Sequence, residues 1–489
     1  MISAILPLVG YLLLTLALAV WVQHRARTGS SCNIVEEYFI GSRSMGGFVL
    51  AMTIIASYTS ASSFVGGPGV AYSLGLAWVL LAMIQVPTTF LTLGVLGKRF
   101  AIIGRRLGAV TITDFLYSRD RSDVVVILCS MALLVFFAAS MVAQFIGGAR
   151  LFQAVTGYPY EVGLILFGVT VVVYTAVGGF RAVVLTDALQ GIVMVVASVV
   201  VFMAVLEAGG GMTQCIQTLK SIDPGLITPS GAGGKVPAPM LFSFWVLVGL
   251  GILGLPQTTQ RCFGYKDSKS MHNAMVMGTL IIGFLLLFMH LAGVLGRAVM
   301  PGLSSGDLII PTLILELLPP FWAGVFVAGP LAAIMSTVDT MLLLVSAAII
   351  KDLYIRYSLN NDSSRVSPKK LSRMSFGCTL AAGILVFAAS FNPPELLVWI
   401  NLFAFGGLEA VFLWPIILGL YWKKANATGA VFSILVGLTV FIFISVFKVQ
   451  LGGVHAIVPT LLLSFLAFWA GNRFGEPAGQ DVRRIFWDE

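Results

Sequence analysis

Long apolar segments recur along almost the whole chain, and their length restricts the fold more than any other feature. A helix of about 20 apolar residues spans the hydrocarbon core of a bilayer. Only 10% of the 489 residues are charged, against about a quarter in soluble domains. The sequence therefore predicts an all-α polytopic membrane protein with about 13 transmembrane helices, approximately at 2–22, 46–72, 74–97, 124–149, 160–179, 185–208, 240–258, 274–299, 319–349, 373–391, 396–421, 427–447 and 454–471.

The distribution of lysine and arginine predicts the orientation of these segments. Basic residues concentrate in the short cytoplasmic loops of membrane proteins. Most of the 29 lysines and arginines fall in alternate connections, above all in residues 98–121. This bias places the N-terminus outside and the 476–489 tail in the cytoplasm. The net charge of +8 is thus a topology signal, and we expect no nucleic acid partner.

A long polar connection at residues 209–238 divides the spans into two groups of five. The first group, 46–208, begins inside and the second, 240–421, begins outside, so the two units have opposite topology. We expect one transporter domain over residues 1–475, with 427–471 as two extra spans. Each group begins with a segment interrupted by glycine and proline, which is typical of transporter binding sites: Gly66, Gly67, Pro68 and Gly69 in the first, and Gly249, Gly251, Gly254 and Pro256 in the second.

The segment 51–69 is rich in hydroxyl groups as well as interrupted. In hydrocarbon, broken helix is tolerated only within protein or beside a water-filled cavity. The segment is therefore a candidate ion or substrate site, although a Gly/Ser-rich helix-packing face is an equal alternative. The pair Ser336-Thr337 strengthens the first interpretation. Two hydroxyls plus carbonyls released by a helix break can supply the oxygens that a sodium ion needs.

Three carboxylates fall within the apolar spans, where ionisable groups are rare and often functional. Asp187 is either an acidic group near the ion path, a helix N-terminal carboxylate, or the partner of Arg181. Asp339 either adds charge near a cation, carries a proton, or is a hydrogen-bonded buried carboxyl. Glu409 is equally compatible with structural pairing and with transport. Five scattered cysteines and four scattered histidines show no metal-ligand spacing, and no catalytic dyad is visible, so we expect neither a cofactor nor an enzyme.

Several ordered motifs, at 41–47, 66–69, 147–151, 174–182, 332–337 and 351–354, give the chain a family likeness. Over residues 35–475 the sequence resembles the sodium:solute symporter family. The resemblance implies a LeuT-type five-plus-five inverted repeat, with a broken first helix in each repeat, and sodium-coupled uptake. It maps the sodium site to the carbonyls of Ala56, Thr59 and Ala333 and the hydroxyls of Ser336 and Thr337, and it maps Asp187 to the inner route of the ion.

The motifs at 38–47, 61–69 and 406–415 are most similar to the pantothenate-transporting branch of this family. Tyr58, Val248 and Ile252 depart from the proline- and sugar-transporting branches, which argues against those substrates. The resemblance implies symport of pantothenate, a small anion, with Na⁺ as coupling ion. Candidate substrate contacts are Thr53, Tyr58, Ser60, Ser63 and Gln257, with a half-helix N-terminus for the carboxylate.

Other functions remain open on the sequence alone. The alternatives are a sodium- or proton-coupled symporter of another small carboxylate, or a channel or sensor. We expect a multi-pass protein of the bacterial inner (plasma) membrane that contacts lipid and needs no obligate protein partner.

Overall fold

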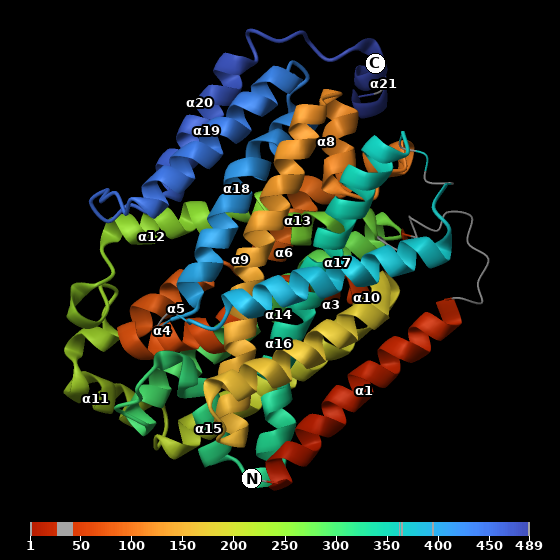
Figure 1. The fold of residues 1–489 in the computed structure, drawn as a ribbon. Helices are drawn as coiled ribbons and strands as arrows, with labels where there is room; N and C mark the ends of the chain where they lie inside the picture. Colours follow the sequence, from red (N-terminus) through yellow and green to blue (C-terminus); the bar gives the residue numbers. More distant parts are fainter. Residues whose placement is uncertain (1, 27–42, 361, 363–364, 394–395, 488–489) are drawn as a thin grey trace.

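The computed structural model describes residues 2–26, 43–360, 362, 365–393 and 396–487, with the side chains of 2–4, 19, 22–26, 177–182 and 368 outside this description (Figure 1). Part of the motif at 38–47, together with the side chain of Arg181, therefore lies outside the described residues. Every regular element in the described ranges is a helix, which confirms the predicted all-α class.

The first half of the chain runs from α1 to α11. Its elements are α1 (Ile2–Ala26), α3 (Gly47–Tyr58), η2 (Ser62–Gly66), α4 (Gly67–Leu74), α5 (Leu76–Met83), α6 (Thr88–Leu91), η3 (Thr92–Gly97), α7 (Lys98–Leu107), α8 (Ile112–Asp120), α9 (Asp123–Thr156), α10 (Tyr160–Ala208) and α11 (Met212–Ile222).

The second half runs from η4 to α21. Its elements are η4 (Pro224–Ile227), η5 (Ala232–Gly234), α12 (Ala238–Phe244), η6 (Trp245–Leu250), η7 (Gly251–Gly254), α13 (Pro256–Thr259), η8 (Gln260–Phe263), α14 (Ser268–Val299), η9 (Gly306–Leu308), α15 (Ile309–Leu317), α16 (Pro320–Ala347), η10 (Ala348–Ser358), α17 (Pro368–Ala389), α18 (Val398–Tyr421), α19 (Ala427–Val446), α20 (Ile457–Gly471) and α21 (Gln480–Trp487).

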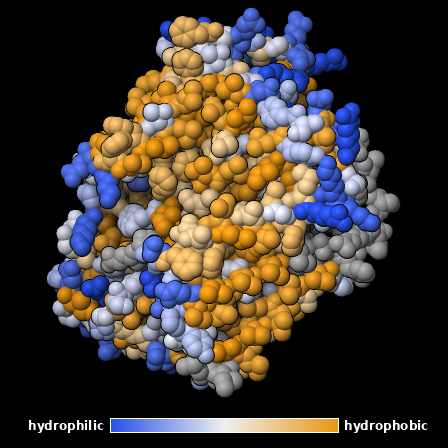
Figure 2. Space-filling view, in the orientation of Figure 1, coloured by the Kyte–Doolittle hydropathy of each residue, from blue (hydrophilic) through white to orange (hydrophobic). Residues whose placement is uncertain are grey.

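Helices of membrane-spanning length dominate the described part of the chain. Eight are long and apolar enough to cross a bilayer, and two bent pairs raise that number to ten. Three shorter apolar helices lie at Ile5–Leu18, Tyr160–Ala176 and Ile457–Gly471. All of these coincide with predicted spans, while the total of thirteen remains a prediction. Figure 2 shows a broad apolar face with hydrophilic residues gathered toward its edges, as expected of a protein surrounded by lipid.

The continuous element α10 corresponds to two predicted spans, 160–179 and 185–208. Tyr174 Oη donates to Thr186 Oγ1 at 2.6 Å, although the two residues are twelve positions apart. Twelve residues of straight α-helix rise about 18 Å, too far for these side chains to meet. The chain therefore reverses direction between Tyr174 and Thr186, and α10 consists of two limbs.

The first bent pair is α3 with η2 and α4, which meet at 71°. The break lies at Thr59 and Ser60, and Thr59 has an extended backbone. It does not lie at Gly66–Gly69, where the glycine and proline signal placed it. Serine hydroxyls explain the difference, because they replace helical hydrogen bonds: Ser63 Oγ accepts from Ser60 N at 3.3 Å, and Ser60 Oγ accepts from Ser62 N at 3.1 Å.

The glycines of the first broken span serve close packing instead. A Cβ on Gly67 would lie 2.3 Å from His290 Nε2 on α14, and a Cβ on Gly69 would lie 2.7 Å from the backbone of Gly306. The alternative interpretation of 51–69, a small-residue packing face, is therefore correct for Gly67 and Gly69, alongside a genuine break a few residues earlier.

The second bent pair is Ala238–Gly254 with Pro256–Phe263, at 46°. Here the break coincides with the sequence signal. Pro256 has no N–H and disfavours helical geometry in the preceding residue, and Leu255 is extended accordingly (φ −88°, ψ 111°). The predicted broken first helix is thus present in both groups of spans.

The long helices α3, α9, α10, α14, α16 and α18 pack together around the two breaks, and α16 is enclosed along almost its whole length. In Figure 1, α19 and α20 lie side by side on one flank, α1 lies on the opposite flank, and the two termini lie at opposite ends of the molecule. The polar connection 209–238 contains α11 and two short turns. It packs inward, since the backbone of Leu226 would lie 2.1 Å from a Cβ on Gly75.

Candidate functional site

The five residues mapped to a sodium site converge between α3 and α16. Ser336 Oγ donates to the Ala56 carbonyl at 2.9 Å, and Thr337 Oγ1 donates to the Thr59 carbonyl at 2.7 Å. Both hydroxyls also contact the Ala333 carbonyl, at 3.2 and 2.9 Å. Two hydroxyls and three carbonyls thus form one buried cluster of neutral oxygens.

The local backbone explains why these oxygens are available. Helix carbonyls normally accept from the N–H four residues later, and a break removes those donors. The extended backbone at Thr59 turns the chain away, so the Ala56 and Thr59 carbonyls accept from hydroxyls of α16 instead. Because Ser336 and Thr337 are adjacent on one helix, a single face of α16 reaches both carbonyls.

Asp187 lies in a second polar cluster. Its Oδ2 accepts from Thr53 Oγ1 at 2.6 Å and from Arg261 Nη2 at 3.2 Å. The pair is almost completely enclosed, with side-chain exposures of 0% for Asp187 and 2% for Arg261. In this conformation Asp187 is one half of a buried ion pair with Arg261, and its position on the inner route of the ion stays a prediction.

Arg261 is the member of this polar cluster that the sequence reasoning missed. Besides Asp187, it donates to Ser57 Oγ at 2.9 Å and to Thr340 Oγ1 at 2.8 Å. It therefore joins α3, α10 and α16, the helices that carry the two polar clusters. As a basic residue near the end of a span it looked like an orientation signal. Its position five residues after Pro256, within the second half of a broken span, could have revealed it.

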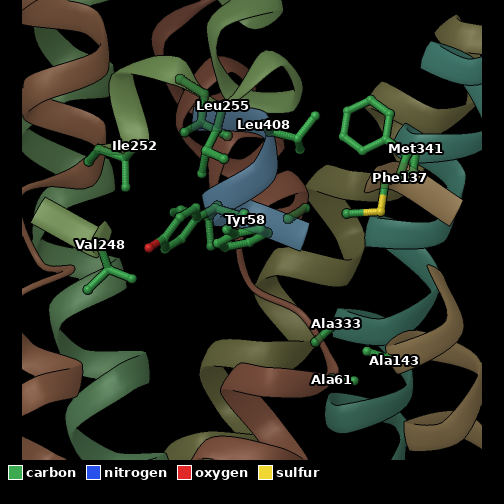
Figure 3. Packing of buried hydrophobic residues seen from close by; sticks show 14 of the residues in the cluster. Tyr58, Ala61, Phe137, Ala143, Val248, Ile252, Leu255, Ala333, Met341 and Leu408 are labelled. Carbon is green, nitrogen blue, oxygen red and sulfur yellow. The ribbon is translucent and has the colours of Figure 1, made fainter. Parts of the chain in front are cut away.

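A small cavity lies beside the first break. It measures about 30 Å³ and is lined by the predicted residues Tyr58, Ser60 and Ser63, together with Ser62, Gly67, Trp78, Ala82, Gln85, Phe244, Val248, Leu286, His290, Val398, Asn401, Leu402 and Phe405. Figure 3 shows Tyr58 with its hydroxyl end toward Val248 of the second broken span. Thr53, which faces Asp187, and Gln257 are outside this lining.

In the first broken span, the backbone N–H groups at the break, where the half-helix of η2 and α4 begins, already have partners. Ser63 Oγ and Ser60 Oγ accept from Ser60 N and Ser62 N. Gln144 Oε1 of α9 accepts from Ala61 N at 2.7 Å. Of the two half-helix N-termini that could meet the substrate carboxylate, the one in the first broken span is therefore capped by side chains in this conformation.

Three other polar groups of the cavity are available to a ligand. Within the described part of the chain, Ser62 Oγ and Trp78 Nε1 are buried without a hydrogen-bond partner. His290 Nδ1 bonds the Leu286 carbonyl at 2.7 Å, so Nδ1 carries the hydrogen and Nε2 of the neutral ring is an acceptor. These donors and acceptors lie among the rings of Tyr58, Phe244 and Phe405.

Asp339 lies on α16 one turn from Ser336. Thr175 Oγ1 donates to its Oδ1, and Tyr174 lies beside it. Its Oδ2 has no hydrogen-bond partner among the described residues. The carboxyl group is thus hydrogen-bonded to Thr175 of α10.

We expect Asp339→Asn to leave sodium-dependent uptake within about twofold of wild type, because asparagine keeps the shape and the acceptor for Thr175. The measurement is uptake at several sodium concentrations between about pH 5.5 and about pH 8.5, a range in which a functional carboxyl would reveal itself. Thr175→Val, which removes the donor, is the matched variant. A large loss of sodium affinity in Asp339→Asn would instead make Asp339 part of the coupling machinery.

The chain is similar to known proteins over most of its length. The sequence pattern of the sodium:solute symporter family matches residues 38–437. The chain is 52% identical to the sodium/pantothenate symporter of Escherichia coli (strain K12), over 98% of each protein. It is 47% identical to the sodium/pantothenate symporter of Haemophilus influenzae (strain ATCC 51907 / DSM 11121 / KW20 / Rd), over 96% of each.

A solved structure confirms the fold. A Na⁺-coupled sialic acid symporter in a substrate-bound, outward-open state superposes with a TM-score of 0.79, covering 98% of this chain and 99% of that one at 19% identity. The likeness extends over almost the whole of both chains and shows a shared fold. With the match to the family pattern over most of its length, the chain belongs to the sodium:solute symporter family.

Proposed function

We propose that the protein is a secondary active transporter that imports pantothenate together with sodium. The observation that carries the proposal is the similarity, over nearly the whole length, to two sodium/pantothenate symporters. The names of these relatives are those of transporters and not of enzymes. The five-oxygen cluster supports a coupling ion, because it offers hard, neutral ligands of the kind that sodium prefers.

Sodium would bind between α3 and α16, at the carbonyls of Ala56, Thr59 and Ala333 and the hydroxyls of Ser336 and Thr337. The same cluster joins the first broken span to a helix of the second group of spans. Binding of the ion would therefore stabilise one arrangement of these two helices over another. A ligand shifts such an equilibrium only through its different affinity for the two states. Sodium would bind more tightly to the state in which α3 and α16 bring the five oxygens together.

Pantothenate would bind in the cavity beside the first break. Its hydroxyl, amide and carboxylate groups match Ser60, Ser62, Ser63, Trp78 Nε1 and His290 Nε2, and its methyl groups match the surrounding aromatic rings. A cavity of about 30 Å³ holds no more than a water molecule or so. Entry of the substrate therefore requires the two broken spans to separate, which is the movement that alternating access demands.

Trp78→Phe tests the substrate site, since it removes the unpartnered N–H while keeping an aromatic ring. We expect the KM for pantothenate to rise about tenfold, because the variant loses a hydrogen bond to a charged group. The sodium dependence should stay unchanged. Trp399→Phe is the control, because Trp399 packs on Trp78 with 5.7 Å between ring centroids but is outside the cavity lining. Equal effects of the two changes would assign Trp78 to packing alone.

The orientation and compartment are also proposals. The bias of basic residues supports an external N-terminus and a cytoplasmic tail in a bacterial inner membrane. Termini at opposite ends of the molecule (Figure 1) agree with this arrangement.

The decisive experiment is uptake of labelled pantothenate by proteoliposomes that contain the purified protein. We expect an inward sodium gradient to drive accumulation and choline replacement to abolish it. Undiminished uptake without sodium, driven by a pH gradient, would refute sodium coupling. If an excess of other small carboxylates competed better than pantothenate itself, the substrate would be a different member of that class.

A further inference from the structure

Glu409, on α18, is a buried residue with a carboxyl group that is not among the proposed sodium ligands. Its exposure is 0%. Neither Oε1 nor Oε2 has a hydrogen-bond partner in the ranges that the structure describes. A carboxylate left alone at bilayer depth costs several kcal/mol, so this side chain needs a cation as its partner.

The described surroundings of Glu409 supply no such cation. No lysine, arginine or histidine in the described part of the chain forms a hydrogen bond to either carboxyl oxygen. The adjacent residues of α18 pack on aromatic rings, Gly406 against Phe441 and Gly407 against Phe136. Tyr58 of α3 lies within its electrostatic range. The partner must therefore come from solution.

The position of the carboxyl group links it to the second break. A Cβ on Gly251 would lie 2.2 Å from Oε2 and 2.4 Å from Cδ of Glu409, so the carboxyl rests directly on the backbone of η7. Gly254, on the same short element, lies against the backbone of Leu413, one turn further along α18. The surroundings of Glu409 therefore change whenever the second broken span moves relative to α18.

A second orphaned polar group lies at the same break. Gln257, immediately after Pro256, is 1% exposed, and both its amide oxygen and its amide nitrogen lack partners among the residues described. Unused polar atoms therefore lie on α13, directly after the break, and on α18, which packs on η7 before it, and such buried unsatisfied groups call for a partner. Tyr58 connects this region to the first break, because it lies between Ala56 and Thr59.

We propose that Glu409 holds a second monovalent cation, a proton or a sodium ion, that crosses the membrane with each pantothenate. The cation enters from outside onto the carboxylate and leaves to the cytoplasm when the second break opens inward. This inference rests on the proposed function. Its consequence is electrical: pantothenate carries one negative charge and the first sodium balances it, so the second cation makes each cycle carry one net positive charge.

The test compares steady-state accumulation of pantothenate in proteoliposomes at zero potential and at about 100 mV, inside negative. One net charge per cycle multiplies the limiting accumulation ratio about 50-fold at that potential. We expect this increase in the wild type and in Glu316→Gln, the same change at an exposed position on α15. We expect none in Glu409→Gln, which still takes up pantothenate with sodium.

Two further arms identify the cation. If the cation is a proton, a pH gradient at equal sodium concentrations stimulates accumulation by the wild type. If the cation is sodium, accumulation by the wild type at equal pH depends more steeply on the sodium gradient than accumulation by Glu409→Gln does. Potential-independent accumulation by the wild type overturns the proposal, whether or not Glu409→Gln folds. A potential response retained by Glu409→Gln overturns it as well. Failure of the proposed function is a different result, namely no sodium-driven uptake at zero potential.

Discussion

Arg261→Gln will produce a protein that is both unstable and inactive, because it leaves Asp187 as an uncompensated buried charge. Breaking a buried ion pair by removing one partner costs about 3–5 kcal/mol. We expect a strongly lowered thermal unfolding midpoint in detergent and the loss of sodium-driven uptake. Asp187→Asn leaves the Arg261 guanidinium as the uncompensated buried charge, so we expect a comparable loss of stability together with slower transport.

The double variant Asp187→Asn/Arg261→Gln separates stability from function. With both charges removed, the unfolding midpoint should recover toward wild type, whereas uptake should not. Arg121→Gln is a matched control, because Arg121 pairs with Asp481 at the same 3.2 Å but with side-chain exposures of 50% and 65%. An exposed pair contributes about 0–1 kcal/mol. If the double variant were as unstable as Arg261→Gln alone, the two residues would not act as a pair.

Removing both hydroxyls of the five-oxygen cluster should have the second large effect. In Ser336→Ala/Thr337→Ala the cluster keeps its three carbonyls but loses two of five ligands. A hydrogen bond or similar contact to a charged group contributes about 1.5–3 kcal/mol. We therefore expect the sodium concentration for half-maximal uptake to rise at least about 100-fold in the double variant and about tenfold in each single variant.

The control for this series is Ser346→Ala on the same helix. Ser346 Oγ is also buried and bonds Ser375 Oγ at 2.9 Å, but it lies almost three turns beyond Ser336. The Ser346→Ala change should leave the sodium dependence of uptake unchanged. Membrane insertion should be normal in all variants, because no charge is left unpaired. A double variant with wild-type sodium dependence would place the ion elsewhere.

The membrane-spanning architecture follows from local sequence, and so does the second break. Apolar length specifies a spanning helix without reference to any other segment, and Pro256 lacks the N–H of a helical hydrogen bond and disfavours helical geometry in Leu255. The pairing of Ser336 and Thr337 with the first break was also predictable once the family likeness was noted. For the apolar spans and the second break the information lies within a few residues of the feature, whereas the pairing of Ser336 and Thr337 with the first break joins residues about 280 positions apart and came from the family likeness.

Other features depend on contacts between distant segments, and the sequence alone did not place them. Gly67 and Gly69 look like helix breakers but allow α4 to approach α14 and η9, so the break itself lies at Thr59 and Ser60. Arg261 looks like a loop residue because only the fold shows that the half-helix after Pro256 turns into the core. The cap that Gln144 provides for Ala61 joins residues 83 positions apart, beyond the reach of any local pattern.

The hydrogen bonds within the five-oxygen cluster bear on the speed of the transporter. The hydroxyls of Ser336 and Thr337 donate hydrogen bonds to the carbonyls of Ala56 and Thr59. These are the same carbonyls that would coordinate sodium. If sodium binds there, its departure lets these groups satisfy one another, and no orphaned carbonyl faces hydrocarbon. The empty carrier can then return across the membrane without a large desolvation barrier. Losing the hydroxyls would therefore slow the return step, and with it the maximal turnover, even when sodium is saturating.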